Sequence, residues 1–321
     1  MNRSFCVAPM MRRTDRHFRF LCSLFSKEAI LFTEMVHANA INRNSPERFL
    51  SNIKVSNPTV LQLGGSNPEE LGKATLTSNA YDYSEINLNL GCPSPKVQSG
   101  NFGAILMKDV LTVKNCLQEM MVSTNKEVTV KIRLGVDDYD TENYLDNFVY
   151  ELSKVGVKTF YVHARIALLK GLGPKDNRTI PPLNYERVLR LNSDFKNLDF
   201  IVNGGISNFH NVKKHFKDLK GIMVGREVYE NPIKLMDVDK IYYNSKKMPK
   251  DLFQIVDEMF HYISSLDNKK DQETSKHHMI NLFKGLVNAK KARILLLNEK
   301  NNQILKKNLI GILNENLIRA A

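Results

Sequence analysis

Eight short runs of apolar and β-branched residues recur along the first three-quarters of the chain, and this repetition constrains the fold more than any other feature. Stretches with helical spacing lie between the runs. Strands that alternate with helices predict an α/β fold with a parallel sheet, and eight such units predict a (β/α)8 TIM barrel. A doubly wound sheet is the alternative. The runs are Phe5–Met10, Ile30–Val36, Val60–Leu63, Glu85–Leu90, Val128–Leu134, Phe160–His163, Phe200–Val202 and Ile222–Val224.

The last quarter of the chain has a different pattern. Apolar residues there recur at helical spacing, as in Leu252, Ile255 and Met259, and the strand runs stop. We therefore predict a catalytic barrel domain over residues 1–240 and a small all-helical C-terminal domain over residues 250–321, with a linker between them that contains Lys and Pro.

The formal net charge of the chain is +12, and much of it lies near the C-terminus. Residues 276–319 contain nine Lys or Arg and two acidic residues, which gives this stretch a net charge of +7. Such a block favours a partner with a phosphate backbone, because Lys and Arg release the counterions bound to it. A solvated, Lys-rich surface is the alternative that composition leaves open.

The four cysteines of the chain, Cys6, Cys22, Cys92 and Cys116, have no paired spacing such as Cys-x-x-Cys. This argues against a zinc module and against a disulfide-stapled secreted protein, so we expect no metal and a cytoplasmic location. The apolar run near the N-terminus ends at Arg12, which makes it too short for a signal peptide or a membrane span. We expect no membrane association.

Polar and glycine-rich residues follow six of the eight predicted strands. In a (β/α)8 barrel the active site is built at the carboxyl ends of the strands, so these residues are the candidates for chemistry. Glycine turns after strands seven and eight let backbone N–H groups approach a phosphate, although a simple tight turn is the alternative. The six segments are Gln62–Gly65, Asn87–Pro95, Lys131–Arg133, His163–Arg165, Asn203–Gly205 and Gly225–Arg226.

Cys92 differs from the other three cysteines because it follows the fourth predicted strand. An ordinary cysteine thiol, with a pKa of about 8.5, is mostly protonated near pH 7 and can act as an acid as well as a nucleophile. Most cysteines serve packing, which is our interpretation of the other three. Gly91 and Pro93 shape the backbone around Cys92, and Gly100 and Gly103 would allow the following loop to close over a substrate.

These segments carry a resemblance to a known family. The chain resembles the tRNA-dihydrouridine synthases, most closely their DusA branch, from Ala8 to Arg226 and more loosely beyond. The matching segments, all in the same order, are Ala8–Met11, Thr14–His17, Leu61–Gly65, Asn87–Ser94, Val97–Ala104, Val130–Gly135, Val162–Arg165 and Asn203–Gly205.

The resemblance implies a barrel that holds FMN, NADPH as the reductant, tRNA as the substrate and a monomeric enzyme. It implies that reduced flavin passes hydride to C6 of uracil while Cys92 protonates C5, at positions 20 and 20a of the D-loop. Lys131 would stabilise the negative charge on the reduced flavin. The implied FMN contacts are Pro9, Met10, Met11, Gln62, Lys131, His163, Asn203, Gly204, Gly205, Gly225 and Arg226.

The resemblance also suggests contacts with tRNA. Lys175 and Arg178 lie in the segment 170–182, which is similar to a tRNA-contacting loop of that branch, and Asn89 is a further candidate. Lys290 and Arg293 lie three residues apart, on one face of a predicted helix, where the branch tends to carry two arginines.

One departure from the family pattern stands out. The chain has Arg12 and Arg13 where the family often has Asp and Trp, and it contains no tryptophan. The local charge therefore changes sign, and we expect activity to persist because backbone contacts from the preceding residues need not change.

Two other functions compete with this interpretation. A flavin barrel that acts on a small pyrimidine, similar to the dihydroorotate dehydrogenases, would need neither the basic C-terminal block nor the basic segment 170–182. A non-catalytic tRNA-binding protein would be colourless when pure, whereas a flavoprotein absorbs visible light.

Overall fold

The computed structural model describes residues 1–52 and 55–320. These residues form two compact units, and each is described by itself. The first unit contains residues 1–11, 30–52 and 58–225, and the second contains residues 12–29, 55–57 and 226–320. Residues 12–29 and 226–240, which we assigned to the barrel domain, thus belong to the second unit.

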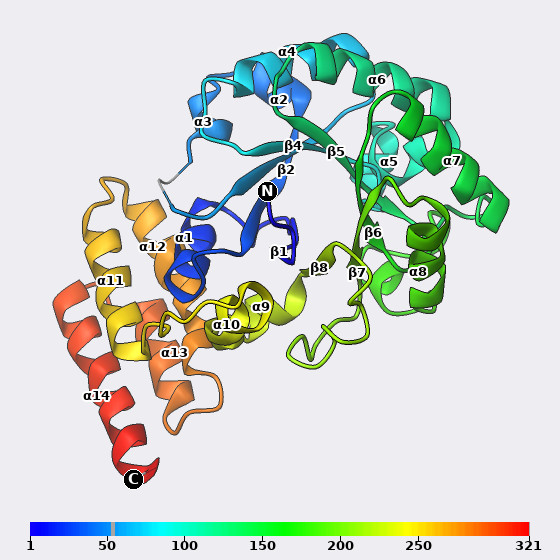
Figure 1. Ribbon diagram of the computed structural model, residues 1–321. Coiled ribbons are helices and arrows are strands. Elements are labelled where there is room, and N and C mark those ends of the chain that lie inside the picture. The colour runs from blue at the N-terminus through cyan, green and yellow to red at the C-terminus, as the bar shows by residue number, and fades with distance from the viewer. Residues whose placement is uncertain (53–54, 321) are drawn as a thin grey trace. The chain divides into compact units, whose positions relative to one another are not determined.

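The first unit is a closed barrel of eight parallel strands, as predicted (Figure 1). Each strand pairs with its neighbours in chain order, and β1 closes the barrel on β8 with Phe5 opposite Ile222 and Val7 opposite Val224. Every predicted strand overlaps an observed one, with bounds that differ by three residues or fewer. The strands are β1 Phe5–Val7, β2 Ile30–His37, β3 Thr59–Gly64, β4 Glu85–Asn89, β5 Glu127–Arg133, β6 Thr159–His163, β7 Asp199–Asn203 and β8 Gly221–Val224.

Helices connect the strands and lie outside the barrel in Figure 1. The four longest, α4, α6, α7 and α8, each begin after a side chain that accepts a backbone N–H of the first turn. The helices of this unit are α2 Ala38–Asn42, α3 Glu47–Leu50, α4 Pro68–Ser78, α5 Pro95–Ser99, α6 Val110–Val122, α7 Glu142–Lys154 and α8 Tyr185–Asp194, with 3-10 helices η1 Gly103–Lys108 and η2 Asp176–Arg178.

The interior of the barrel is apolar on one side and polar on the other. Side chains from β1, β2, β3, β7 and β8 form an apolar cluster with Tyr161 of β6. On β4 and β5 every second residue is instead polar, and alternate residues of a strand share one face. Buried polar groups need hydrogen-bond partners, so this half of the interior is organised by hydrogen bonds. The polar residues are Glu85, Asn87 and Asn89 on β4, and Glu127, Thr129, Lys131 and Arg133 on β5.

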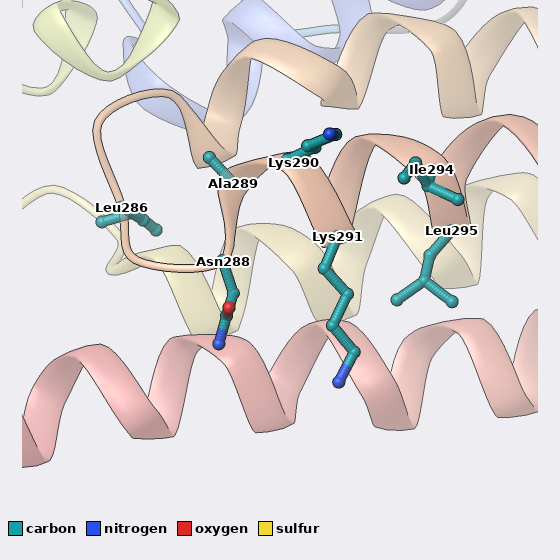
Figure 2. Close-up of a pocket in the computed structure, with 7 residues that line it drawn as sticks. All are labelled: Leu286, Asn288, Ala289, Lys290, Lys291, Ile294 and Leu295. Atoms are coloured by element: carbon teal, nitrogen blue, oxygen red, sulfur yellow. The ribbon is translucent and has the colours of Figure 1, made fainter.

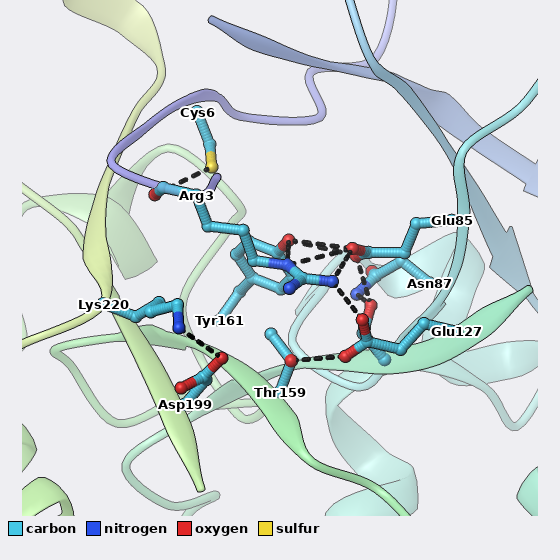
Figure 3. Close-up of polar contacts among 10 residues, drawn as sticks. Arg3, Cys6, Glu85, Asn87, Glu127, Thr159, Tyr161, Asp199 and Lys220 are labelled. Carbon is cyan, nitrogen blue, oxygen red and sulfur yellow. Dashed lines mark hydrogen bonds and ion pairs between the residues drawn. The ribbon is translucent and has the colours of Figure 1, made fainter. Parts of the chain in front are cut away.

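A buried ion pair anchors the polar half near the amino ends of the strands. The Arg3 guanidinium donates to Glu85 Oε2 from Nη2 at 2.6 Å and from Nε at 3.1 Å, and it also contacts Glu127 (Figure 3). The Tyr161 hydroxyl donates to Glu85 Oε1 at 3.0 Å. Arg3 and Glu85 are both buried, so their charges depend on each other.

The second unit is helical and includes α1, which lies between β1 and β2 in the sequence. Within it, His17 Nδ1 lies 2.6 Å from the Tyr262 hydroxyl, and His278 Nε2 lies 2.9 Å from Asp15 Oδ2. These contacts fasten α1 to α11 and α12. The elements are α1 Arg16–Phe25, α9 Arg226–Glu230, α10 Val238–Tyr243, α11 Leu252–Ser264, α12 Lys269–His278, α13 Ala289–Asn298 and α14 Asn302–Ala320, with η3 Pro232–Asp237 and η4 Met279–Phe283.

Within residues 1–52 and 55–320, no helix combines the length and the apolar character that a membrane span requires. The same part of the chain holds no group of three or more His, Cys, Asp or Glu side chains arranged to bind a metal ion.

Gly221 provides a test of how tightly the barrel closes. A Cβ atom at Gly221 would lie 1.9 Å from the Arg3 carbonyl oxygen, so Gly221→Ala must displace backbone. We expect Gly221→Ala to lower the free energy of unfolding by about 1–3 kcal/mol, as overpacking does. The measurement is urea unfolding followed by circular dichroism.

A matched glycine serves as the control for that substitution. Gly311 lies inside α14 with open space around its Cβ position, so Gly311→Ala should instead raise stability by about 1 kcal/mol. Equal stability of Gly221→Ala and the unmodified protein would contradict tight closure.

Candidate active site

Cys92 lies just beyond the carboxyl end of β4, in a segment whose backbone N–H and carbonyl groups form hydrogen bonds. Its N–H donates to Asn89 Oδ1 at 2.9 Å, and the neighbouring N–H of Gly91 donates to the same oxygen at 3.1 Å. The Cys92 carbonyl accepts the N–H of Ala104 at 2.9 Å. The thiol forms no disulfide and is partly exposed.

Gly103 is required by this arrangement. Its φ of +75° is one that side chains disfavour, and a Cβ there would lie 2.7 Å from the Cys92 carbonyl oxygen. The loop after Cys92 therefore returns to pack directly against the cysteine backbone. This contact restricts the freedom that we predicted for the loop from its two glycines.

Three side-chain amides are linked by hydrogen bonds that begin at Asn89, the residue that contacts the Cys92 backbone. Asn89 Nδ2 donates to Gln62 Oε1 at 2.7 Å, and Gln62 Nε2 donates to Asn87 Oδ1 at 2.8 Å. All three side chains are buried, on β3 and β4. Gln62 and Asn89, predicted separately as flavin and substrate contacts, are thus joined in one hydrogen-bonded group.

Lys131 and Asn203 form a second polar pair at the strand ends. Lys131 Nζ donates to Asn203 Oδ1 at 3.0 Å, and Asn203 Nδ2 donates to the Met223 carbonyl at 2.8 Å. Burial lowers the pKa of Lys131 to about 7, with a further contribution from Arg133, while Cys92 acts in the opposite direction. The charged form of Lys131 is thus disfavoured in the protein alone, and an anionic ligand would stabilise it.

Arg133 joins the Cys92 segment to the segment 165–182. Its guanidinium donates to the Gly91 carbonyl at 3.0 Å from Nε, and to the Ile166 and Asn177 carbonyls at 3.0 and 2.9 Å from Nη1. Its pKa is lowered to about 10, by burial first and also by the charges of Arg178 and Arg165, while Cys92 acts in the opposite direction. Positive charge is therefore concentrated beside Cys92.

The turn after β7 packs against His163. Gly204 and Gly205 have φ values of +115° and +63°, and a Cβ at Gly204 would lie 2.6 Å from His163 Cδ2. A Cβ at Gly205 would lie 2.5 Å from Leu183 Cδ1. Only glycine fits both positions, so the backbone itself forms this part of the surface.

The ends of β1 and β8 meet beside this turn. The Ala8 N–H donates to the Val224 carbonyl at 2.8 Å, and the Cβ position of Gly225 lies 3.5 Å from Met10 Sδ. Pro9 and Met10 are partly buried, whereas Met11 is 56% exposed.

The segment 170–182 is anchored by one buried residue. Asn177 Nδ2 donates to the Leu168 carbonyl at 2.7 Å, and Asn177 Oδ1 accepts the Leu168 N–H at 2.8 Å. Lys175 and Arg178 flank it in the sequence with exposed side chains. Lys175 and Arg178 therefore extend from a segment that the hydrogen bonds of Asn177 hold in place.

Lys290 and Arg293 lie in the second unit, on α13, with exposed side chains. Lys290 borders an open hollow of about 610 Å³ whose lining also includes Lys291 and Asn288 (Figure 2). Figure 2 shows Lys290 and Lys291 extending from α13 in different directions. Arg226, the first residue of α9, also belongs to the second unit.

Comparison with known proteins identifies the family. A family model described as dihydrouridine synthase (Dus) matches residues 6–317, nearly the whole chain. The chain belongs to the dihydrouridine synthase family. The resemblance stated from the sequence is thereby confirmed.

Individual dihydrouridine synthases match at 40–42% identity along most of their length. The tRNA-dihydrouridine(20/20a) synthase of Vibrio parahaemolyticus is 42% identical over 289 residues, which is 89% of this chain and 88% of that protein. The synthase of the same name from Escherichia coli is 41% identical, over 90% of this chain and 84% of its own. That of Synechocystis is 40% identical, over 88% and 85%.

The geometry joins most of the predicted barrel residues of this synthase into three groups. Cys92, Asn89 and Gln62 form one, Lys131 and Asn203 a second, and the third comprises His163 with the glycine turn.

Arg12 and Arg13 lie in the second unit, where the Arg13 guanidinium lies 4.7 Å from the centre of the Tyr229 ring.

Sequence reasoning did not include Thr129 in the candidate site, and it named Asn87 and Arg133 at strand ends without giving them a role. Their positions carried a signal, because Asn87 and Asn89 alternate on one strand, as do Thr129, Lys131 and Arg133 on the next. Asn177 also escaped notice, since its role depends on long-range contacts with backbone carbonyls.

The lowered pKa of Lys131 predicts a pH dependence of stability. The unfolded chain keeps an ordinary lysine pKa, so between about pH 7 and about pH 10 it binds more protons than the folded, ligand-free protein. The free energy of unfolding, relative to that of Lys131→Met, should therefore rise with pH across this range. Urea unfolding at several pH values measures the difference.

Lys196 provides the matched control for this pH series. It is exposed in the loop that precedes β7, at the opposite end of the barrel. The difference in the free energy of unfolding between the unmodified protein and Lys196→Met should therefore stay constant over this pH range. A Lys131→Met difference that is flat between these pH values would count against a lowered pKa.

Proposed function

We propose that this protein is an FMN-dependent, NADPH-driven enzyme that reduces uridine to 5,6-dihydrouridine in the D-loop of tRNA, at positions 20 and 20a. The observation that carries the proposal is Cys92 beside Lys131 and Arg133, with its backbone N–H held by the buried amide of Asn89. The names of the relatives supply the substrate and the positions. We propose a cytoplasmic monomer.

The residues at the strand ends fit FMN. The backbone at Gly204 and Gly205 follows β7, where barrels of this type bind phosphate, and side chains at these positions would fill the turn. Gly225 and Arg226 would extend that phosphate site. A planar polar ring would lie against the backbone of Pro9 to Met11, with amides from Gln62 and Asn203 and with His163 at its edge.

Lys131 suits the part of the flavin that becomes negatively charged. Its charge is disfavoured by burial and by Arg133, so an adjacent anion would stabilise it. When bound, FMN supplies the hydride that C6 of the uracil receives, after reduction by NADPH.

Cys92 completes the reduction by protonating C5. Its S–H proton passes to the carbon, which leaves a thiolate in the part of the site that also holds Lys131 and Arg133. Asn89 orients the uracil, and the target nucleotide must leave the base stack before its ring can lie flat in the site.

Exposed Lys and Arg side chains on both units would bind the phosphate backbone of tRNA. Lys175 and Arg178 present charge from the segment 170–182 of the barrel, and Lys290 and Arg293 do so from α13. Exposed Lys and Arg attract the phosphate backbone with little dependence on base sequence.

Replacement of Cys92 tests the chemistry. Cys92→Ala should keep the visible absorbance of FMN and still consume NADPH, yet form dihydrouridine about 100-fold to 10,000-fold more slowly, the range for loss of a general acid. Dihydrouridine in tRNA is measured by mass spectrometry after digestion.

Cys116→Ala is the matched control, because Cys116 is buried in α6 and should be dispensable for turnover. Full product formation by Cys92→Ala would refute the proton-donor role. A colourless pure protein would refute the flavin assignment itself.

Salt dependence tests the tRNA contacts. Removing two phosphate contacts with Lys175→Ala and Arg178→Ala should weaken tRNA binding and reduce the slope of log K against log salt by about 2. The same change is expected from Lys290→Ala with Arg293→Ala. Binding isotherms between low and moderate salt give the slopes.

Lys158 and Lys196 provide the matched control pair for the salt series. Both are exposed in loops that lead into strands, at the end of the barrel opposite Cys92. Their replacement by alanine should leave the slope unchanged, and an equal loss in both pairs would show nonspecific attraction instead.

A further inference from the structure

A chain of hydrogen bonds runs from Cys92 into the interior of the barrel. Its outer half begins at the backbone N–H of Cys92, which donates to Asn89 Oδ1 at 2.9 Å. Asn89 Nδ2 then donates to Gln62 Oε1 at 2.7 Å, and Gln62 Nε2 donates to Asn87 Oδ1 at 2.8 Å.

The inner half ends on a carboxylate. Asn87 Nδ2 donates to Thr129 Oγ1 at 2.8 Å, and the Thr129 hydroxyl donates to Glu85 Oε1 at 2.6 Å. Glu85 and Thr129 are fully buried, and both lie on strands next to each other in the barrel. Arg3 pairs with the other carboxylate oxygen.

Each end of the chain fixes the same direction for every bond. At the outer end, a backbone N–H can only donate, so Asn89 must accept through Oδ1 and donate through Nδ2. At the inner end, a carboxylate paired with arginine can only accept, so Thr129 must donate to Glu85 and accept from Asn87. One orientation of the Gln62 amide satisfies both requirements, because its Oε1 accepts from Asn89 and its Nε2 donates to Asn87.

The charge state of Glu85 suits this role. The pKa of Glu85 is raised, by burial first, while Arg3 and the Thr129 hydroxyl act in the opposite direction and favour the ionised form. The groups that contact its oxygens are the Arg3 guanidinium and the hydroxyls of Thr129 and Tyr161, all of which can donate. A carboxylate satisfies all of these donors at once.

We propose that Thr129 and Glu85 are positioning residues, which orient Asn89 and the backbone of Cys92 from inside the barrel through this one-way chain. Two backbone N–H groups occupy Asn89 Oδ1, so Asn89 offers only its remaining N–H to a bound base. It is thus set to bind a carbonyl oxygen, such as those of uracil, rather than an amino group. The proposal rests on the proposed function in placing uracil beside Asn89.

Thr129→Val is the direct test, because valine keeps the shape and removes the hydroxyl. In the FMN-loaded enzyme it should speed hydrogen exchange at the Gly91 and Cys92 amides by roughly tenfold, since the chain loses its anchor. It should lower kcat for dihydrouridine formation by a similar factor and leave KM for tRNA unchanged. Thr129→Ser, which retains the hydroxyl, should restore both.

Thr159→Val is the matched control. The Thr159 hydroxyl is equally buried and donates to Glu127 at 2.5 Å, but it lies outside the chain that reaches Cys92. This variant should lose a similar amount of thermal stability while exchange at Cys92 and kcat stay unchanged. Asn87→Asp, which keeps the side-chain shape and removes the donor, replaces Thr129→Val if that variant does not fold.

Exchange at Gly91 and Cys92 that is no faster in Thr129→Val than in Thr159→Val would overturn the proposal. So would an equal loss of kcat in both. Hydrogen exchange reports on the backbone whatever reaction the enzyme performs, so an unmodified protein that forms no dihydrouridine would refute the proposed function and leave the exchange result standing.

Discussion

The barrel depends on the pairing of Glu85 with Arg3. A carboxylate buried inside a strand barrel is costly unless donors surround it, and Arg3, from the segment that leads into β1, supplies the charge. Tyr161 and Thr129 add hydroxyls from two further strands. Because β1 is also the strand that closes the barrel on β8, the same few residues tie closure to the polar half of the interior.

The barrel could be predicted from the sequence because each strand is a short apolar run between polar turns. Eight such runs that alternate with helices are enough to indicate a parallel barrel. The division into units did not follow. Helix α1 lies between two barrel strands in the sequence, so it was counted with them, but its contacts are with α11 and α12 through His17 and Asp15. Contacts over about 250 residues leave no mark on local spacing, since His17 alone is equally compatible with either unit.

The candidate site was predictable where a residue's place at a strand end determines its neighbours. Cys92, Lys131, His163 and the glycine turn lie at the ends of strands that are adjacent or nearly so. Arg133 was missed as a link because its partners are backbone carbonyls at Gly91, Ile166 and Asn177, which any sequence would supply. Family resemblance supplied candidate ligand contacts but carried no information about the hydrogen bonds that hold those residues in place.

The charges at the strand ends oppose one another in the protein alone. Arg165 and Arg178 both lower the pKa of Arg133, which in turn lowers that of Lys131. Such mutual repulsion reduces stability, and a site that keeps it is adapted to a ligand that brings negative charge. A phosphate, a reduced flavin and an RNA backbone each do so, and a thiolate left at Cys92 after proton transfer would do so within the protein. The repulsion among these cations is therefore consistent with a site that is completed by a negatively charged ligand.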